Sequence, residues 1–345
     1  MKAVAITKTG GPEALQVREY PDPQPGPREL SVKVTAAGVN FADILARKGL
    51  YPDGPPLPAV VGYEVAGEVL ECGKEVRRFR AGDKVLALTR FQGYSEMVVV
   101  PEDQVFHIPE NLSSSQAAAI PVNYLTAWQL VEMGGLKKGE TLVIHNAGGG
   151  VGLAALEIAR KRGARTIGTA SAWKHERLLE RGLDVAIDYR TEDWVDQVQH
   201  HTDGKGADLI FDPLGGSNWK KSFLALRPAG RLGLFGVSEM TRSGLYGPLK
   251  FFSVLQRMPF YTPIRLMNTN KGVYGVNLGR MWTEKKKVGQ WAKAILNGAK
   301  RGWIHPYIDA AFTFEQASEA HRYLEERKNF GKVLLVPGGI ESDLE

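Results

Sequence analysis

The apolar and polar positions of this chain follow two different patterns, one in its first part and another in its middle. From Lys2 to about Pro101, short β-rich runs are broken by glycine and proline. These runs are Val4–Thr7, Leu30–Ala36, Glu64–Glu71, Lys84–Leu88 and Glu96–Val100. Such spacing predicts an irregular antiparallel β domain. In Pro109–Pro121, serines precede a run of alanines, which predicts a capped helix that leads into the next domain.

In the middle of the chain, strand-like and helix-like stretches alternate. The β-rich patches are Thr141–Ile144, Arg165–Gly168, Val185–Ile187, Asp208–Phe211, Arg231–Phe235 and Gly272–Val276. Helical stretches such as Lys174–Arg181 and Glu192–Gln199 separate several of them. This alternation predicts parallel βαβ units in a doubly wound α/β domain.

The tail of the chain carries Trp303–Ile308, a helix-like stretch at Phe314–Arg327 and a strand at Lys332–Val336. Because the strand series is complete near Val276, we expect this tail to return to the first domain. The predicted fold is therefore α/β, with a doubly wound parallel sheet (a Rossmann domain) inserted into an irregular β-rich domain. The predicted boundaries are 1–121 and 280–345 for the β-rich domain and 122–279 for the inserted domain.

A glycine turn is the most informative feature of the sequence. The strand Thr141–Ile144 runs into a glycine cluster, and a helical pattern begins directly after it. Such a turn aims free backbone N–H groups and the positive end of the helix dipole at one point, which suits a phosphate or pyrophosphate. Alanine stands where the dinucleotide fingerprint has its first glycine. The predicted cofactor-binding residues here are Ala147, Gly149, Gly150, Val151 and Gly152. A purely structural turn is the alternative.

The end of the second middle strand bears on which dinucleotide is bound. An NAD site usually has an acidic residue about 20 residues after the first glycine. This chain has none there and offers Ser171 and Lys174 instead. A hydroxyl and an ammonium suit the 2′-phosphate of NADP, so the sequence favours NADPH. The alternative is that Lys174 is a solvated lysine and that Ser171 only caps a helix.

Composition excludes several classes of protein. The chain has 345 residues, of which 24% are charged and 43% hydrophobic, as expected for a globular protein of about two domains. It has no apolar stretch of about 18 residues and no signal-peptide pattern. A single cysteine, Cys72, excludes an internal disulfide framework and favours a cytoplasmic location. The net charge is +6 without blocks of lysine and arginine, so we expect no nucleic-acid partner.

A series of motifs runs through the whole chain in a fixed order. They are Gly38–Asp43, Arg47–Pro52, Pro58–Gly67, Ala81–Val85, Gly139-Glu140 and Phe330–Val333. Together they resemble the zinc-independent quinone oxidoreductase family of the medium-chain dehydrogenase/reductase superfamily. The stretches Gly168–His175, Asp212–Gly216 and Gly331–Gly338 most resemble its vesicle-amine-transport-protein-like branch. The resemblance implies a GroES-like catalytic domain that carries the inserted Rossmann domain.

Zinc-dependent members of that superfamily hold their catalytic metal with Cys, a His-Glu pair and a second Cys or an acid. By resemblance, the matching positions here are Asn40, Tyr63-Glu64 and a position near Asn123. With one cysteine, neither a four-cysteine lobe nor three N/S ligands can be assembled. The adjacent pair His200-His201 is a poor chelator, and we expect it in a solvated loop. We predict that the protein requires no metal.

Without a metal, the chemistry has to suit an acceptor that takes a hydride readily. Quinones and α,β-unsaturated carbonyl compounds do so, because the product anion is delocalised and hydrogen bonds stabilise it. The resemblance implies that Asn40, Asp43, Tyr51 and Tyr63 line the pocket beside the nicotinamide. Tyr51 is the candidate hydrogen-bond or proton donor to the substrate oxygen, and a packing role is its alternative.

Other cofactor contacts are implied by the resemblance. Thr126 matches a position near the carboxamide, and its alternative is a hydroxyl bonded to its own helix backbone. Tyr189 matches a position near the adenosine ribose. We expect Phe235, Val276 and Asn277 to face the nicotinamide half, since they end the fifth and sixth strands. Lys332 follows a glycine near the cofactor cleft of relatives, and a surface lysine is the alternative.

The segment from Glu239 to Glu284 has no acidic residue between its ends and is rich in basic and aromatic residues. A lid or a subunit interface is the default interpretation of its central part, 240–270, and peripheral contact with an anionic membrane is the alternative. Gly272–Val276 should lie at a sheet edge, where pairing with a second copy would form a homodimer.

The alternative to a reductase is a cofactor-binding structural or membrane-associated adaptor with little catalytic activity.

Overall fold

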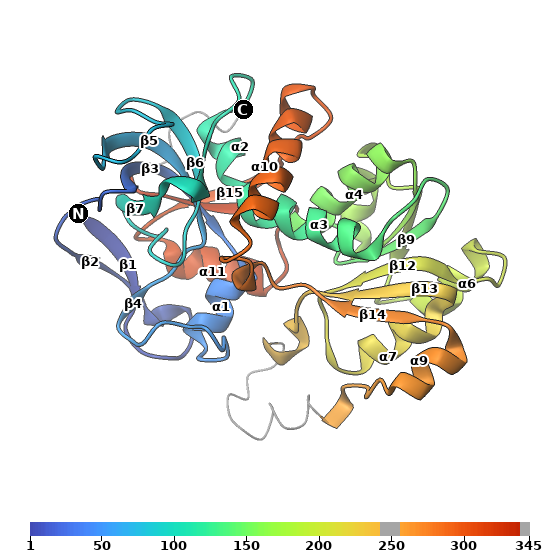
Figure 1. The fold of residues 1–345 in the computed structure, drawn as a ribbon. Coiled ribbons are helices and arrows are strands. Elements are labelled where there is room, and N and C mark those ends of the chain that lie inside the picture. Colours follow the sequence, from blue (N-terminus) through green and yellow to red (C-terminus); the bar gives the residue numbers. More distant parts are fainter. Residues whose placement is uncertain (242–255, 339–345) are drawn as a thin grey trace. The chain divides into compact units, whose positions relative to one another are not determined.

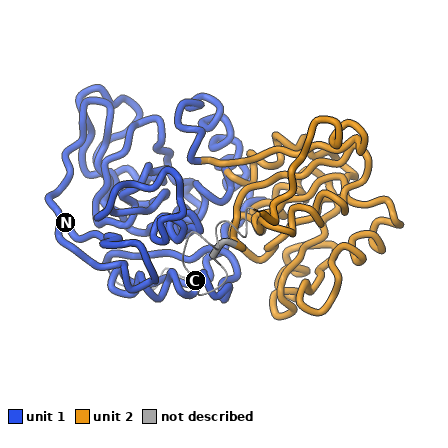
Figure 2. Tube along the Cα trace, turned by 90° about the horizontal axis from the view of Figure 1, so that it is seen from below, with its two compact units in different colours: residues 1–125, 279–345 blue, residues 126–278 orange. Residues whose placement is uncertain are grey.

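A computed structural model gives the structure of the protein and describes residues 1–241 and 256–338. The chain divides into two compact units, which Figure 2 distinguishes by colour. Unit 1 comprises Met1–Leu125 and Gly279–Glu345, and unit 2 comprises Thr126–Leu278. Unit 1 contains an antiparallel β structure, and unit 2 a parallel sheet with helices, so the predicted fold class is confirmed.

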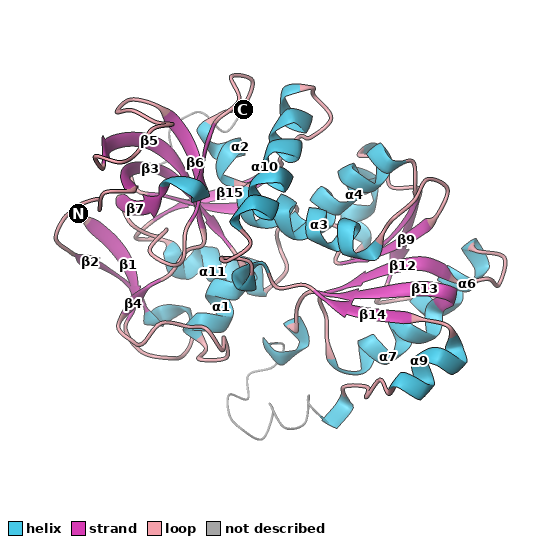
Figure 3. Ribbon diagram, viewed as in Figure 1, coloured by secondary structure: helices cyan, strands magenta, loops and turns pink. Residues whose placement is uncertain are grey.

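The main sheet of unit 1 has seven strands, and most of its neighbouring pairs are antiparallel (Figure 3). Six of them follow the order β15-β16-β3-β5-β6-β8, and β7 also pairs with β3. Their bounds are β3 Glu29–Val39, β5 Glu64–Cys72, β6 Lys84–Leu88, β7 Met97–Pro101, β8 Val105–His107, β15 Ile308–Thr313 and β16 Lys332–Val336. A smaller sheet joins β2 (Leu15–Glu19), β1 (Lys2–Ile6) and β4 (Ala59–Val60).

Unit 1 also contains helices. They are α1 (Phe41–Arg47), α2 (Ser114–Ala118), α10 (Lys285–Lys300) and α11 (Ala317–Glu325), and α3 (Pro121–Gly134) continues into unit 2. The predicted serine cap of α2 is confirmed, because the Ser113 side chain accepts a hydrogen bond from the Gln116 backbone N–H at 3.2 Å. The Gln116 side chain in turn accepts one from the Ser113 N–H at 3.0 Å, which completes a capping box.

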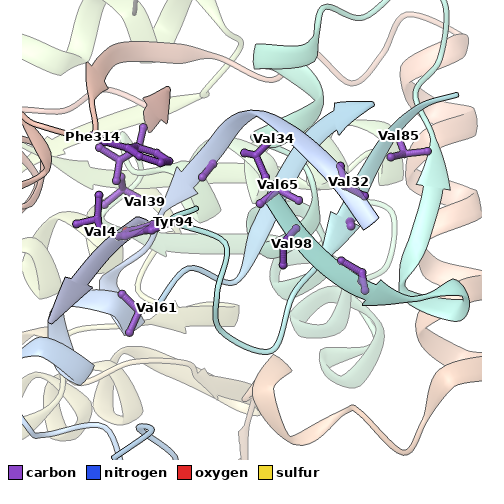
Figure 4. Packing of buried hydrophobic residues seen from close by; sticks show 14 of the residues in the cluster. Val4, Val32, Val34, Val39, Val61, Val65, Val85, Tyr94, Val98 and Phe314 are labelled. Atoms are coloured by element: carbon purple, nitrogen blue, oxygen red, sulfur yellow. The ribbon is translucent and has the colours of Figure 1, made fainter. Parts of the chain in front are cut away.

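The core of unit 1 is built mainly from β-branched residues of its strands. Figure 4 shows part of this cluster, in which the labelled side chains are Val4, Val32, Val34, Val39, Val61, Val65, Val85, Tyr94, Val98 and Phe314. Branched side chains suit a pleated, buried surface because they lose little rotamer freedom there. The two C-terminal elements β16 and α11 contribute Leu335 and Ala320, so the tail completes the core that the first part of the chain begins.

The sheet of unit 2 is parallel throughout, in the order β11-β10-β9-β12-β13-β14. Figure 1 labels β9, β12, β13 and β14 among these strands. The bounds are β9 Thr141–His145, β10 Arg165–Ala170, β11 Val185–Asp188, β12 Ala207–Asp212, β13 Leu226–Leu234 and β14 Gly272–Gly275. The order reverses on either side of β9, so this strand lies at the switch point where doubly wound sheets bind ligands. Each predicted β-rich patch of this domain falls on one of these strands.

Helices connect the strands of unit 2. They are α4 (Gly150–Arg162), α5 (His175–Glu180), α6 (Trp194–His201), α7 (Gly216–Ala225) and α9 (Pro263–Thr269). One prediction was wrong: His200-His201 do not lie in a loop but form the last residues of α6. The Asp193 side chain caps α6 by accepting from the Val195 N–H at 2.9 Å. The helix ends at His201, and the C-cap residue Thr202 donates its N–H to the carbonyl of Gln199.

The basic aromatic segment predicted to be a lid, an interface or a membrane contact lies partly outside the described residues. Its described part includes α9, on which Ile264 and Met267 are 67% and 73% exposed. Phe260, just before the helix, is 82% exposed. Over residues 1–241 and 256–338, no helix is both long and apolar enough to cross a bilayer. The role of the segment stays a prediction.

Candidate functional site

The glycine turn after β9 opens directly into α4. Gly149 is the N-cap of this helix, and its N–H donates to the carbonyl of Asn146 at 2.9 Å. A Cβ on Gly152 would lie 2.4 Å from Asn146 O and 2.5 Å from Ala147 O. Gly152 is therefore needed so that the helix can approach the turn of its own chain. The N–H groups of the first turn have no partner within the helix, which leaves them available to an anion.

A buried polar network beneath this turn was not predicted from the sequence. His145 Nδ1 lies 2.9 Å from the Thr169 hydroxyl, and His145 Nε2 lies 3.2 Å from that of Ser222. Ser222 donates at 2.6 Å to Asp212, the last residue of β12. Burial lowers the pKa of His145, so the ring stays neutral. The network fixes the carboxyl ends of β9, β10 and β12 together, and a histidine ending an apolar strand was its only signal in the sequence.

The predicted phosphate-binding residues gather past the ends of β10 and β11. The strands pair with Ala170 opposite Asp188, so the next residues, Ser171 and Tyr189, come together. The Ser171 and Tyr189 hydroxyl oxygens are 3.5 Å apart. Ser171 makes no capping hydrogen bond, which removes the interpretation that it only caps a helix.

Lys174 is not the solvated lysine that the alternative interpretation assumed. Its side chain is only 4% exposed, as is that of Ser171. The Lys174 ammonium lies 4.9 Å from the ring centre of Trp173, within the range of a cation–π interaction. A hydroxyl and a largely buried ammonium therefore stand beside the position where an NAD site has an acid.

The remaining predicted cofactor residues of unit 2 lie on α3 and past the ends of two strands. Thr126 is a buried residue of α3. Leu234 pairs with Gly275 in the last strand pair, so Phe235 and Val276 directly follow β13 and β14. Val276 is buried and Asn277 is exposed. Phe235, Val276 and Asn277 therefore lie at the carboxyl edge of the sheet, where ligands of such folds bind.

In unit 1, strand register brings together three residues that are far apart in the sequence. Leu334 of β16 pairs with Gly38 of β3, and Ala37 pairs with Val65 of β5. The neighbouring positions, Lys332, Asn40 and Glu64, are consequently adjacent. The Lys332 ammonium donates to Asn40 Oδ1 at 2.7 Å and forms an ion pair with Glu64. Lys332 is 3% exposed, so it is not a surface lysine.

Glu64 and Asn40 are bonded further within this cluster. Asn40 Nδ2 donates to Glu64 Oε1 at 2.8 Å and to the Gly38 carbonyl at 3.2 Å. The other Glu64 oxygen accepts from the backbone N–H of Val122 at 2.7 Å. Glu64 is fully buried, and its charge is balanced by the ammonium. Asn40 and Lys332 are predicted site residues, whereas the bond of Glu64 to both was not predicted from the sequence.

Asp43 is fully buried at the start of α1 and accepts three hydrogen bonds. Its donors are the N–H of Asn40 at 2.8 Å, the N–H of Gly62 at 3.0 Å and the Tyr94 hydroxyl at 2.9 Å. Burial raises the pKa of the Asp43 carboxyl to about 7, although these hydrogen bonds act in the opposite direction. The carboxyl thus holds the start of α1, the loop at Gly62 and Tyr94 in one arrangement.

Two predicted tyrosines and a phenylalanine form an aromatic group in unit 1. The ring centres of Tyr51 and Tyr63 are 5.9 Å apart at an edge-on angle, and those of Tyr63 and Phe91 are 5.3 Å apart. The Tyr63 hydroxyl is buried and lies close to that of Tyr51. Burial raises the pKa of both tyrosines, so both remain protonated donors at neutral pH.

The candidate metal positions do not form a metal site. Throughout the part of the chain that the structure describes, no group of three or more His, Cys, Asp or Glu residues could hold a metal ion. At the positions that match zinc ligands by resemblance, Asn40 and Glu64 are bonded to an ammonium instead. These residues do not fit zinc, which prefers thiolate and imidazole ligands.

Comparison with known proteins gives matches along most of the chain. Residues 26–110 match the alcohol dehydrogenase GroES-like domain, and residues 150–294 match the zinc-binding dehydrogenase family. The chain is 38% identical to the human synaptic vesicle membrane protein VAT-1 homolog, over 98% of this chain and 87% of that protein. It is 35% identical to a quinone oxidoreductase of Pseudomonas aeruginosa, over 97% of this chain and 99% of that protein.

A solved structure extends these similarities to the fold. The Escherichia coli quinone oxidoreductase, whose structure was solved in complex with NADPH, superposes with a TM-score of 0.87 at 30% identity. The superposition covers 98% of this chain and 100% of the E. coli chain.

Proposed function

Since the chain belongs to the quinone oxidoreductase-like family of medium-chain dehydrogenases and reductases, in the branch of the VAT-1 homologues, we propose that it is a zinc-independent NADPH-dependent reductase of quinones or α,β-unsaturated carbonyl compounds. The observation that carries the cofactor part is the buried pair Ser171 and Lys174, which replaces the acid of an NAD site.

Unit 2 would hold the cofactor. The first-turn N–H groups of α4 would bind its pyrophosphate, because they point out of the helix with the positive end of its dipole. Ser171, Lys174 and Tyr189 would bind the 2′-phosphate and ribose. The nicotinamide half would contact Thr126, Phe235, Val276 and Asn277. When bound, NADPH supplies the hydride, and the protein supplies orientation and electrostatics.

Unit 1 would act on the substrate oxygen. Hydride addition to a quinone or enone leaves a negative charge on that oxygen, and positioned donors stabilise it. The phenols of Tyr51 and Tyr63 are protonated donors, and their hydroxyl groups lie close together. Asn40 and Asp43 would serve as positioning residues, since their polar atoms are engaged in holding β3, α1 and the Gly62 loop.

A second candidate function is a cofactor-binding adaptor with little activity. One observation favours it: Phe260, Ile264 and Met267 are exposed in a segment without acidic residues. Relatives of the chain are named as synaptic vesicle membrane proteins, which agrees with an adaptor at a membrane surface. We favour the reductase because unit 1 also carries the protonated phenols of Tyr51 and Tyr63, which a reduction would use and cofactor binding alone would not.

The test is NADPH oxidation, followed as the loss of absorbance at 340 nm, with a panel of benzoquinones, naphthoquinones and enones. We expect turnover with at least one acceptor class, no need for added metal, and retention of activity after dialysis against a chelator. Tight NADPH binding with no turnover on the whole panel would favour the adaptor. A lack of NADPH binding would contradict both candidates.

A further inference from the structure

The cluster of Lys332, Glu64 and Asn40 is more than a fixed corner of unit 1. We propose that Lys332 is a positioning residue whose ammonium is the built-in cation of the candidate active site, in place of a metal ion. By resemblance, Asn40 and Glu64 stand at positions of zinc ligands in the zinc-dependent members of the superfamily, yet here they are organised around this ammonium. The part of this inference that concerns activity rests on the proposed function.

The ammonium fixes the orientation of the Asn40 amide. An ammonium can only donate hydrogen bonds, so the amide oxygen has to face Lys332 and the amide nitrogen has to face away. Asn40 Nδ2 accordingly donates to Glu64 Oε1 and to the Gly38 carbonyl. Both of its N–H groups are thereby engaged. Asn40 is therefore not a donor to the substrate, and the protonated donors of unit 1 at this place are the tyrosines.

The same ammonium connects four elements of unit 1. Lys332 begins β16, Asn40 follows β3 as the N-cap of α1, and Glu64 begins β5. Glu64 also accepts from Val122 in the first turn of α3. Asn40 donates its backbone N–H to Asp43, so the orientation is passed to the start of α1. Tyr63 directly precedes Glu64, and its position depends on this anchor.

Glu64 and Lys332 pack tightly against Gly38. A Cβ on Gly38 would lie 2.3 Å from Glu64 Oε1 and 2.6 Å from the Cε of Lys332. Glu64 is the only carboxylate of the cluster, and both of its oxygens already accept hydrogen bonds. A dication within about 4 Å of the ammonium would also be repelled strongly in a site of low dielectric constant. The ammonium thus takes the place that a metal ion would occupy at these positions.

A competing role for Lys332 is direct contact with the cofactor, as the resemblance implied. The two roles differ in what the carboxylate of Glu64 does. If Lys332 acts through Glu64 and Asn40, losing the ammonium harms the site because it leaves a buried carboxylate unpaired, and removing that charge as well relieves the harm. If Lys332 holds a cofactor phosphate, a change at Glu64 cannot restore what is lost.

The experiment compares Lys332→Met, Glu64→Gln, the double variant and Lys332→Arg with the unmutated protein. The exposed Lys328, whose side chain is 62% exposed, gives the matched control Lys328→Met. Thermal unfolding, the Kd for NADPH from its fluorescence, and kcat with a quinone are measured for each. Cobalt uptake is followed by its visible absorption, since cobalt replaces zinc in tetrahedral sites.

We expect Lys332→Met to lower kcat by about 100-fold, as misplacement of a site by about 1 Å does, with the Kd for NADPH changed by less than twofold. The double variant should recover at least tenfold of that loss and unfold at a higher temperature than Lys332→Met. Lys332→Arg and Lys328→Met should keep the Kd. The unmutated protein should take up no cobalt.

A tenfold or larger rise in the Kd of Lys332→Met that persists in the double variant would overturn the proposal in favour of cofactor contact. One cobalt per chain in the unmutated protein would overturn it as well. If Lys332→Met does not fold, recovery of folding in the double variant supports the proposal and its absence contradicts it. An unmutated protein that reduces no acceptor refutes the proposed function, while the binding, unfolding and cobalt measurements still judge the role of Lys332.

Discussion

Replacing Lys174 with alanine should remove most of the preference for NADPH over NADH. A hydrogen bond to a charged group contributes about 1.5–3 kcal/mol, and each 1.4 kcal/mol is a factor of ten in affinity. Because the Lys174 side chain is 4% exposed, solvent and salt screen its charge little, and we apply the whole range. Lys174→Ala should therefore raise the Kd for NADPH by about 10- to 150-fold and leave the Kd for NADH nearly unchanged.

The assay is a fluorescence titration of each nucleotide, repeated at low and high salt. Lys205→Ala is the matched control, since Lys205 is an exposed lysine of the same unit. The unmutated protein should bind NADPH more tightly than NADH at both salt concentrations. Equal affinities in the unmutated protein would refute the reasoning. An equal loss of affinity for both nucleotides in Lys174→Ala would show that the lysine supports the fold and does not read the 2′-phosphate.

Four further results are expected. Tyr63→Phe should lower kcat by about 100-fold, the usual cost of losing a donor to a developing oxyanion, with unchanged NADPH binding; kcat within twofold would assign that role elsewhere. Asp43→Asn should change how stability depends on pH. Burial raises the pKa of Asp43 in the folded protein from its ordinary 3.8 to about 7, so this group stabilises the fold at low pH and loses that contribution as the pH rises through 7. Urea unfolding from about pH 4 to 8 should therefore show a weaker decline of stability in the variant. Elemental analysis should find no stoichiometric zinc, and one zinc per chain would contradict the prediction that the protein requires no metal. Light scattering should give a homodimer joined through the edge strand β14. The backbone N–H of Val276 donates to Leu234 of the neighbouring strand, so the backbone N–H groups at odd positions, such as that of Val273, point to the other side of β14. Val273→Pro should therefore give monomers that keep their circular dichroism.

The sequence by itself determined the elements whose signals are local. The parallel sheet of unit 2 could be predicted because each strand is a short apolar run and each crossover a helical one. The glycine turn was recognisable because all of its residues are close in sequence. A Cβ at Gly149 or Gly152 would clash with residues of the same turn, and both glycines lie within eight residues of the end of the strand. Ser113 as a helix cap was equally local. The motifs of the family then indicated the class of oxidoreductase, because they are contiguous stretches of residues.

Only the tertiary structure decided which distant residues form ion pairs and hydrogen bonds with one another. Lys332 and Glu64 are 268 residues apart, and nothing in either neighbourhood indicates the other. Their contact follows from the register of β16, β3 and β5, which depends on the burial of whole strand faces and not on any single motif. The same holds for Ser222, which meets His145 only through the parallel order of the sheet. Local patterns select elements, whereas burial and electrostatic pairing between elements select the partners of each polar group.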